Sequence, residues 1–207
     1  MRFDEESWEE RYRERPELWS GQPNAQLVAE VSDLTPGTAL DAGCGEGGDA
    51  LWLAERGWEV TGADIATTAL ERAARHAEAV GLKVDWVHAD LAIWTPPARF
   101  DLVTSHFLHV PGEARDAVFA RLAGAVAPGG TLLVVGHHES DLHAGVHRPD
   151  VPGMFFTGEE LAADLGDGWR IGFAGTRPRR TRDAEGREVT IRDAILRAVR
   201  ESSPVRE

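Results

Sequence analysis

Hydrophobic positions in the N-terminal part of this 207-residue chain follow helical spacing. Trp8, Tyr12 and Trp19 fall on or near one stripe, and Pro16 interrupts it. Residues 24–34 form a second amphipathic stretch, which ends at a Thr-Pro-Gly sequence. The spacing therefore predicts two short helices before any strand.

Short apolar runs then alternate with amphipathic stretches over about a hundred residues. The predicted strands are 38–42, 58–63, 83–88, 100–105 and 131–135. The predicted helices between them are 49–56, 67–80 and 113–126. Strand and helix in this order indicate parallel βαβ units, with helices on both faces of an open sheet.

The last third of the chain has a different pattern. A His- and Pro-containing loop is expected over 137–156, and Thr157 begins a short helix. Two alternating segments, 169–176 and 188–199, are expected to form an antiparallel hairpin joined by the Arg-rich residues 177–187. The fold class is thus α/β, with a mostly parallel sheet that ends in an antiparallel pair.

The strongest chemical signal is the sequence Leu-Asp-Ala-Gly-Cys-Gly-Glu-Gly at 40–47, which follows the first predicted strand and opens a helix. Glycines there allow a sharp turn and a close approach of the backbone to a ligand. Gly43, Gly45 and Gly48 also satisfy the dinucleotide pattern G-x-G-x-x-G, and such a match alone is weak. A tight turn without a ligand is the remaining alternative.

Two acidic residues at later strand ends favour a nucleoside ligand. Asp64 ends the second strand, where its carboxylate can accept hydrogen bonds from ribose hydroxyls. Asp90 follows the third strand and can meet an adenine edge while Leu91 packs on the ring. All these strand ends lie at the carboxyl edge of the sheet, where open α/β folds bind ligands.

These residues together resemble the class I S-adenosylmethionine-dependent methyltransferases, and the resemblance covers nearly the whole chain. It implies a Rossmann-like, seven-stranded sheet, the cofactor S-adenosyl-L-methionine and the product S-adenosyl-L-homocysteine. It assigns the methionine part of the cofactor to the glycine loop, the ribose to Asp64, the adenine to Ile65, Asp90 and Leu91, and the transferable methyl to the region of Ser105 and His106. The loop residues concerned are Asp41, Gly43, Cys44, Gly45, Glu46 and Gly47.

The N-terminal elements further resemble the small tellurite-resistance and thiopurine methyltransferase-like branch, in which an N-terminal helix closes over the cofactor. This predicts one methyltransferase domain over 1–207: a cap (1–36), a cofactor-binding core (37–136) and a substrate-side region (137–207). Trp8, Tyr12 and Trp19 would then close over the sulfonium, an arrangement that cation–π attraction favours. Ordinary packing of an amphipathic helix is the alternative.

Charge near the loop argues against a nicotinamide-dependent oxidoreductase. Asp41, Glu46 and Asp49 crowd the loop, and a pyrophosphate would be repelled there, whereas a sulfonium with an α-ammonium group is not. The only tyrosine is Tyr12, so no Tyr-x-x-x-Lys proton donor exists. A non-catalytic, cofactor-binding regulatory protein remains a second alternative, since it would need the same acidic residues.

Composition excludes several other classes. The net charge of −13 disfavours nucleic acid and anionic membranes as partners. The basic cluster Arg177, Arg179, Arg180 and Arg182 is interpreted as a solvated hairpin face, with recognition of an anionic small substrate as the alternative. The single cysteine, Cys44, permits no intramolecular disulfide and reads as a small buried side chain. With no apolar run of about 20 residues, a cytoplasmic protein is expected.

Histidines are the remaining candidates for chemistry. His106 and His109 follow the fourth strand, His137 and His138 follow the fifth, and further histidines lie at 143 and 147. His106 or His137 could act as a general base or orient the substrate, or these side chains could simply cap strand ends. A metal site in this group is disfavoured, because adjacent histidines on a strand point to opposite faces and Gly145 and Pro149 oppose a helix.

The size of the chain favours a small-molecule methyl acceptor, handled by a monomer or a homodimer. An activated methyl group needs mainly an aligned nucleophile. Thiols and other soft nucleophiles need little or no general base, whereas oxygen and nitrogen nucleophiles often need one.

Overall fold

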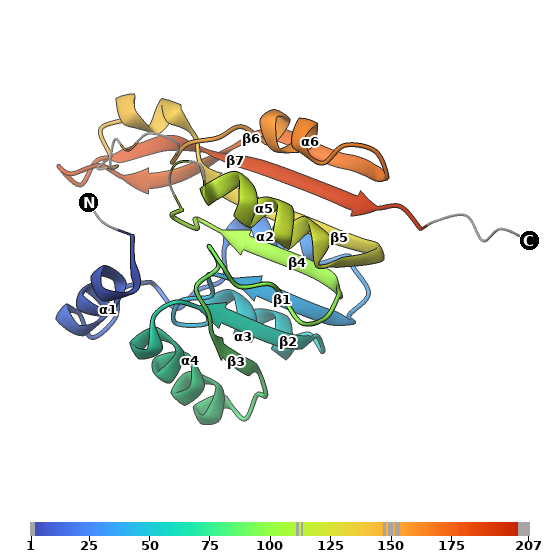
Figure 1. Cartoon of the computed structure of the whole chain (residues 1–207). Helices are drawn as coiled ribbons and strands as arrows, with labels where there is room; N and C mark the ends of the chain where they lie inside the picture. Colours follow the sequence, from blue (N-terminus) through green and yellow to red (C-terminus); the bar gives the residue numbers. More distant parts are fainter. Residues whose placement is uncertain are drawn as a thin grey trace, which may run out of the picture.

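The computed structural model describes residues 3–110, 112, 114–146, 148, 151 and 154–202. Its described part contains a seven-stranded sheet in the order β3-β2-β1-β4-β5-β7-β6 (Figure 1). The strands are β1 (Thr38–Ala42), β2 (Glu59–Asp64), β3 (Asp85–His88), β4 (Phe100–His106), β5 (Val126–His137), β6 (Trp169–Arg182) and β7 (Glu188–Arg200). The first five pair in parallel, and β7 lies antiparallel between β5 and β6. The predicted mostly parallel sheet with a terminal antiparallel hairpin is confirmed.

Helices cover both faces of this sheet. They are α1 (Glu5–Glu14), α2 (Ala25–Val31), α3 (Gly48–Glu55), α4 (Thr67–Val80), α5 (Ala114–Gly124) and α6 (Gly158–Asp164), with a short 3₁₀ helix η1 (Glu139–His143). Local sequence explains several ends: Asn24 caps α2, Gly81 ends α4 in the left-handed conformation, and Thr157 with Glu160 forms a capping box at α6.

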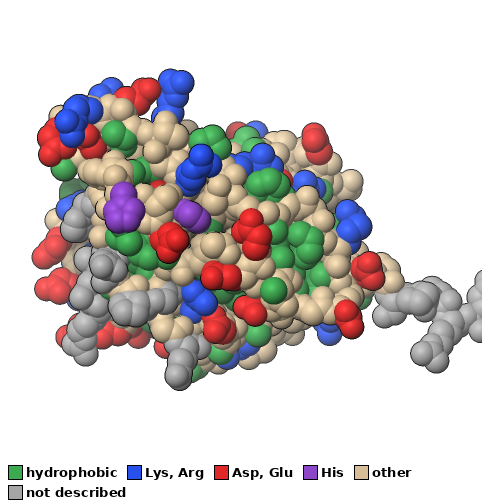
Figure 2. Space-filling view, turned by 90° about the horizontal axis from the view of Figure 1, so that it is seen from above, with side chains coloured by type: hydrophobic (Ala, Val, Ile, Leu, Met, Phe, Trp, Pro, Cys, Tyr) green, Lys and Arg blue, Asp and Glu red, His purple; other side chains and the backbone are tan. Residues whose placement is uncertain are grey.

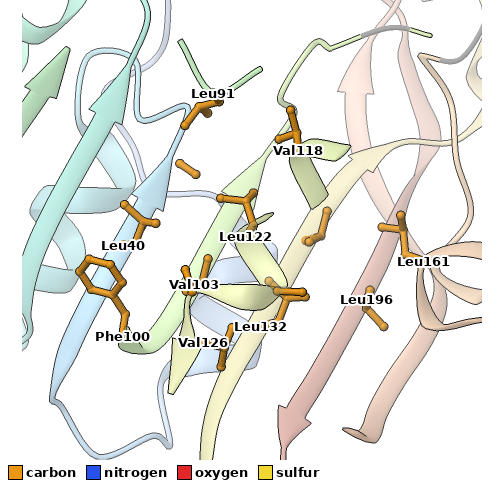
Figure 3. Close-up of a cluster of buried hydrophobic side chains, with 14 of the residues drawn as sticks. Leu40, Leu91, Phe100, Val103, Val118, Leu122, Val126, Leu132, Leu161 and Leu196 are labelled. Atoms are coloured by element: carbon orange, nitrogen blue, oxygen red, sulfur yellow. The ribbon is translucent and has the colours of Figure 1, made fainter. Parts of the chain in front are cut away.

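Two hydrophobic layers result from the alternation of side chains along the central strands. Leu132 and Val134 of β5 pack with α5 and α6, in the cluster shown in Figure 3. Leu133 and Val135 of the same strand pack with α2 and α3 on the opposite face. A strand that is buried on both faces has near-continuous apolar residues, which is what the 131–135 run showed.

The two largest differences from the predicted boundaries are in β5 and β6. Strand β5 begins at Val126, before the Pro-Gly-Gly sequence expected to precede it, and its pairing with β4 shifts register between Phe100 and Leu102. Strand β6 continues through the Arg-rich segment to Arg182, so most of 177–187 is paired strand and only a tight turn remains near Gly186. Arginine-rich strands lack the apolar alternation that sequence patterns detect, which explains the second error.

The N-terminal helix α1 lies beyond the carboxyl ends of β1, β2 and β4 (Figure 1). Glu9 attaches it to the start of α4, because its carboxylate accepts hydrogen bonds from the Thr68 amide (2.9 Å) and hydroxyl (2.6 Å). The sequence-predicted continuation of α2 to residue 34 is absent, since the helix ends at Val31.

The surface mixes charges of both signs. In the view of Figure 2, acidic, basic and hydrophobic side chains are interspersed, and histidine side chains show toward the left of this face. None of the helices in the described part combines the length and apolarity needed to cross a membrane.

Candidate functional site

A cavity of about 860 Å³ opens at the carboxyl ends of the parallel strands. Its walls come from α1, the loops after β1, β2, β3 and β4, the end of β5, and the β6 side of the hairpin. Among the sequence-predicted residues, those that line it are Trp8, Tyr12, Trp19, Gly43, Cys44, Gly45, Glu46, Asp64, Ile65, Asp90, Leu91, His106 and His137. Asp41, Gly47 and Ser105 are not in its lining.

The glycine loop turns through left-handed backbone conformations. Gly45 has φ +52°, and a Cβ there would lie 3.0 Å from the Tyr12 hydroxyl, so the residue must be small where α1 meets the loop. Gly47 has φ +85°, and a Cβ there would lie 2.8 Å from Trp86 and 2.9 Å from Ala73. The hydrogen of Gly47 thus faces packed side chains of β3 and α4, not the cavity, and its role in this structure is a turn with close packing.

Asp64 ties the loop to the end of β2. Its Oδ2 accepts a hydrogen bond from the Gly45 amide at 2.8 Å, and its Oδ1 accepts one from the Ala66 amide at 2.9 Å. Burial raises the pKa of this carboxyl, and these backbone donors oppose the rise. Each oxygen retains a second lone pair, so the side chain can still accept bonds from a ligand in the cavity.

Asp90 and Leu91 follow β3 at the same edge. Asp90 Oδ1 accepts a hydrogen bond from the Ala92 amide at 2.9 Å, which fixes the turn after the strand. Leu91 is 6% exposed and belongs to the hydrophobic layer beneath α5. Both residues reach the cavity, as does Ile65 after β2.

Glu46 holds the N-terminal segment against the loop. Its Oε2 accepts hydrogen bonds from the backbone amides of Leu18 (3.1 Å) and Trp19 (3.0 Å), and its Oε1 lies 2.8 Å from Nη1 of Arg72. Trp19 Nε1 also donates to the Tyr12 hydroxyl at 3.0 Å. Glu46 also lines the cavity, so its predicted contact with the cofactor stays a prediction. Its bonds to the N-terminal segment and to Arg72 were not anticipated from the sequence.

Ser105 and Cys44 have structural surroundings. The Ser105 side chain is fully buried and its Oγ donates to the carbonyl oxygen of Ala42 at 3.0 Å, which joins β4 to β1. Burial raises the pKa of the Cys44 thiol, with a further rise from the nearby Asp41 carboxylate, so the thiol is not a nucleophile at neutral pH.

The hydrogen bonding of the Asp41 carboxylate is incomplete. It is 2% exposed, and its Oδ2 is buried without a hydrogen-bond partner among the described residues. Burial, and then the charge of Asp49, raise its pKa to about 8. A buried acceptor in this state would gain from a cationic or donor group next to it.

His106 lies beside Asp41 and is paired with Asp49. Its Nδ1 lies 2.8 Å from Asp49 Oδ2, and its side chain is 4% exposed. Burial disfavours the imidazolium, but the Asp49 carboxylate and then Asp41 outweigh it, so the pKa of His106 is raised. Asp49 was noted in the sequence only as a charge near the loop; its position in the first turn after the loop could have indicated that it faces the same edge.

The pKa of His137 is shifted in the opposite direction from that of His106. Burial, followed by the charge of Arg148, lowers its pKa to about 3, so its imidazole is neutral at physiological pH. Its ring stacks on Phe107 at 4.6 Å between centroids. Burial and nearby arginines likewise lower the pKa of His109, which also lines the cavity, to about 4.

The other histidines do not converge on the cavity. His138 caps the 3₁₀ helix η1 by accepting a hydrogen bond from the Ser140 amide at 3.2 Å, a role different from the capping of strand ends considered from the sequence. Neither His138 nor His143 lines the cavity, and His147 lies outside the described residues. Within the described ranges, the one group with metal-ligand spacing is Asp41, Asp49 and His106, so the alternative of a metal site around residues 137–143 gains no geometric support.

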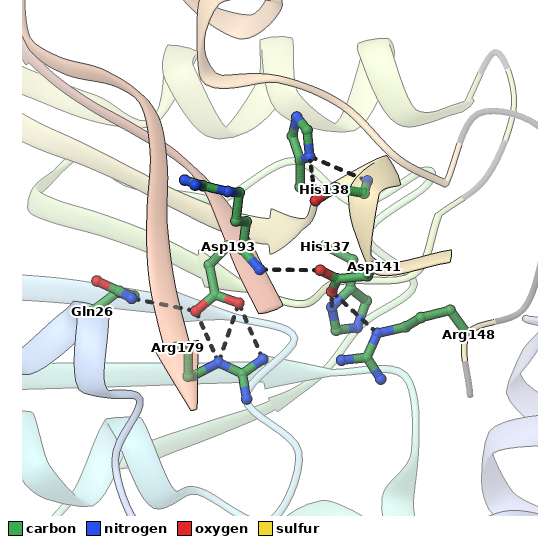
Figure 4. A network of polar contacts seen from close by, with 9 residues as sticks. Gln26, His137, His138, Asp141, Arg148, Arg179 and Asp193 are labelled. Carbon is green, nitrogen blue, oxygen red and sulfur yellow. Dashed lines mark hydrogen bonds and ion pairs between the residues drawn. The ribbon is translucent and has the colours of Figure 1, made fainter. Parts of the chain in front are cut away.

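Two arginines complete the wall beyond β5. Arg179 of β6 and Arg148 of the loop after η1 both line the cavity. Arg179 makes a bidentate pair with the buried Asp193 of β7, with Nε 2.8 Å from Oδ2 and Nη2 3.0 Å from Oδ1 (Figure 4). The Arg-rich segment was interpreted from the sequence as a solvated face. Arg179 corrects that interpretation, because its side chain pairs with the buried Asp193. The sequence alone could not identify Asp193 as the partner, since the two residues lie on different strands.

Comparison with known proteins finds similarity to methyltransferases. Residues 39–130 match the family described as a methyltransferase domain. The chain is 36% identical over 126 residues to 2-heptyl-1-hydroxyquinolin-4(1H)-one methyltransferase of Mycobacteroides abscessus, covering 58% of this chain and 56% of that protein. It is 38% identical over 133 residues to a trans-aconitate 2-methyltransferase of Streptomyces avermitilis, covering 59% and 48%.

Residues 39–130 are thus similar to methyltransferase domains, and the relatives matched over this region are named as methyltransferases. The chain spans about half the length of the curated relatives it matches.

Solved structures of methyltransferases share this fold. The structure titled "Conversion of a Disulfide Bond into a Thioacetal Group during Echinomycin Biosynthesis" is 26% identical with a TM-score of 0.75, covering 97% of this chain and 93% of that one. Magnesium protoporphyrin IX methyltransferase from Synechocystis, with bound S-adenosylhomocysteine, is 26% identical with a TM-score of 0.64 over 86% and 79%. TehB from Haemophilus influenzae, at 20% identity and a TM-score of 0.73 over 86% and 62%, shares the fold, as the resemblance to the tellurite-resistance branch predicted.

Proposed function

We propose that this protein is a methyltransferase, which transfers the methyl group of S-adenosyl-L-methionine to a small molecule bound in the same cavity. The observation that carries the proposal is the convergence, in one cavity of about 860 Å³, of the glycine loop, the acidic strand ends of β2 and β3, and the His106–Asp49 pair. That volume is near the upper end of the roughly 300–1,000 Å³ typical of ligand sites, which allows two small ligands.

The residues present fit a cationic cofactor. Glu46, Asp49 and Asp64 line this part of the cavity, so it favours a positively charged group. Asp41 lies within 4.8 Å of Asp49, outside the lining, and adds a buried oxygen without a hydrogen-bond partner among the described residues. Asp64 would hold the ribose, and Ile65, Asp90 and Leu91 would surround the adenine. The cofactor, when bound, supplies a methyl group already activated on a sulfonium.

The cap would exclude water from the cofactor. Trp8, Tyr12 and Trp19 line the cavity from the N-terminal segment, which Glu46 holds in place. Their rings are consistent with contact to a cation, since Trp and Tyr faces attract positive charge.

His106 would accept the proton of the acceptor. Its imidazole reaches the cavity, and Asp49 holds Nδ1 and stabilises the imidazolium that results. His137, with its pKa near 3, is a poor base and would instead orient the acceptor by packing and hydrogen bonding. A base of this kind suits hydroxyl, amine and thiol acceptors; a thiol or another soft nucleophile would need it least.

The relatives are consistent with a small acceptor. Their printed names concern a hydroxyquinolone, trans-aconitate and the disulfide of echinomycin biosynthesis, which differ in the acceptor they present. An assay of the methyl acceptor must therefore include several kinds of acceptor atom. Its cytoplasmic location and its occurrence as a monomer or homodimer stay predictions.

The test is a transfer assay with labelled S-adenosylmethionine and a panel of thiols, phenols, carboxylic acids and amines. We expect product from at least one class, and a loss of roughly 10²–10⁴-fold in kcat for a hydroxyl or amine acceptor in His106→Gln. Asp49→Asn should lower kcat less. The affinity for S-adenosylhomocysteine, measured by calorimetry, controls for the fold in both variants.

Two results would contradict the proposal. Absence of product with every acceptor class, despite bound cofactor, would favour the non-catalytic regulatory alternative. Unchanged turnover of every accepted substrate in His106→Gln would remove the role of His106 as a base.

A further inference from the structure

The cavity divides by charge along the order of the strands. The carboxylates that line the cavity lie at or after the ends of β1, β2 and β3; they are Glu46, Asp49, Asp64 and Asp90. Beyond β4, the lining includes residues of β5, of β6 and of the loop after η1, and the arginines there are Arg148 and Arg179. His106, at the end of β4, lies between the two halves.

Each of these arginines pairs with a buried carboxylate that lies outside the cavity lining. Asp193 and Asp141 are 0% exposed and do not line the cavity, whereas Arg179 and Arg148 do. Asp193 accepts hydrogen bonds from Nε and Nη2 of Arg179, and Nη1 of Arg179 does not donate to Asp193. A guanidinium fixed in this way needs little further ordering to bind a ligand, because its rotamer is already set.

The cavity wall beside Arg179 contains aromatic rings. The guanidinium carbon lies 5.3 Å from the centroid of the Phe107 ring, and the His137 ring stacks on Phe107 at 4.6 Å between centroids. Leu108 and Val110 extend the apolar wall. A ligand that satisfies both features has a planar, apolar body and a negatively charged end.

Building on the function proposed above, we propose that the methyl acceptor is a small conjugated or aromatic carboxylic acid whose carboxylate is bound by Arg179, with Arg148 beside it. A carboxylate matches the planar donor geometry of a guanidinium. A phosphate dianion fits less well, because the charges of Arg148 and Arg179 are already offset by Asp141 and Asp193. The acceptor would then place its anion over β6 and β7 and its nucleophilic atom near His106.

The balance of the reaction follows from this placement. The acceptor atom forms a bond to the methyl carbon as the carbon–sulfur bond of the sulfonium breaks, and the electron pair of that bond stays on sulfur. The proton of a protic acceptor passes to His106. The carboxylate end takes no part in bond making, so Arg179 determines specificity and position.

The test compares matched acids and amides on the protein saturated with S-adenosylhomocysteine. Benzoate and benzamide, and cinnamate and cinnamamide, are titrated by calorimetry or by ligand-observed NMR. We expect each carboxylate to bind at least about 10-fold more tightly than its amide, as a charge-assisted pair adds roughly 1.5–3 kcal/mol. Equal binding of acid and amide, or binding of neither, overturns the inference.

Variants locate the preference. Arg179→Gln combined with Asp193→Asn removes both charges of the pair and should abolish the preference for the acid. Arg179→Lys keeps the charge that Asp193 needs and should reduce the preference at least threefold, which decides the matter if the double variant does not fold. Arg180→Gln is the control, because Arg180 is 81% exposed, points to the other face of β6 and pairs with Glu188 at the surface.

The outcomes separate this inference from the function it rests on. Failure of S-adenosylhomocysteine to bind the unaltered protein would contradict the proposed function. Normal binding of S-adenosylhomocysteine with no acid preference, or with a preference retained in both Arg179 variants, would contradict only the assignment of Arg179.

Discussion

At the residue scale, the carboxylates around the glycine loop have different tasks despite their similar positions. Asp64 accepts hydrogen bonds from two backbone amides. Glu46 accepts hydrogen bonds from the N-terminal segment, and Asp49 pairs with His106. Asp41 alone has a buried oxygen without a partner among the described residues. A buried carboxylate without a partner destabilises the ligand-free protein. Its presence is explained if a cationic ligand binds nearby and interacts with it.

Asp41→Asn should therefore stabilise the ligand-free protein, increasingly so at higher pH. The pKa of Asp41 is about 8 in the folded chain against an ordinary 3.8, so protonation favours folding. The contribution of Asp41 to the free energy of unfolding is fully present below about pH 3.8 and is lost as the pH rises to about 8. Asparagine keeps the shape without the charge, so the variant should melt at least about 3 °C higher than the natural protein at pH 8.5, or roughly 1 kcal/mol.

Thermal unfolding from pH 5.5 to 8.5 measures this difference. The exposed Asp33→Asn serves as the control. The same Asp41 variant should bind S-adenosylhomocysteine more weakly. A melting difference that is constant across this pH range would show that Asp41 carries no buried charge.

Ser105→Ala should separate structure from binding. The Ser105 hydroxyl donates to Ala42 and is fully buried, so the variant should lose about 1 kcal/mol of unfolding free energy. Affinity for S-adenosylhomocysteine should not change, because the side chain does not line the cavity. A fivefold loss of affinity, measured by calorimetry, would restore the cofactor contact expected from the sequence.

At the scale of elements, periodicity predicted the strands that are buried on both faces. The apolar run at 131–135 and the Gly81 stop of α4 were visible in the sequence, and the structure confirms both. The extension of β6 to Arg182 was not predicted, because its arginines read as a solvated loop. Burial of Arg179 against Asp193 depends on a pairing between two strands, which no local pattern carries.

The same reason limits prediction of the site. The glycine loop, Asp64 and Asp90 could be found, since each directly follows an apolar run. The pairing of His106 with Asp49 and the occupation of Glu46 by Leu18 and Trp19 join elements that are separate in sequence. Only the folded chain shows them.

The cap should loosen when Glu46 is removed. Glu46→Ala frees the amides of Leu18 and Trp19 and leaves Arg72 without its 2.8 Å partner. Breaking a buried ion pair costs roughly 3–5 kcal/mol, so trypsin should cleave after the arginines of α1 at least about 10-fold faster. The control is Glu14→Ala, an exposed α1 residue. Equal cleavage rates in the two variants would mean that Glu46 does not hold the cap.

At the scale of the whole molecule, strand order brings the chemistry together. Residues in or directly after β1, β2, β3, β4 and β5 reach one cavity because the carboxyl ends of the parallel strands share an edge, and the hairpin adds Arg179 of β6 from the last third of the chain. The charged side chains that line the cavity are distributed unevenly, with carboxylates toward β3 and arginines toward β6. That polarity suits a cationic methyl donor and an anionic acceptor in one cavity.

The most direct test of this account is the binding of S-adenosylhomocysteine to the unaltered protein, with NADH as the competing ligand, measured by calorimetry and thermal shift. The account predicts one bound S-adenosylhomocysteine per chain. At 100 times its Kd, the ligand should raise Tm by about 5–10 °C, since such occupancy adds about 2.7 kcal/mol. A shift with NADH and none with S-adenosylhomocysteine would contradict the assignment of the cavity to a methyl donor.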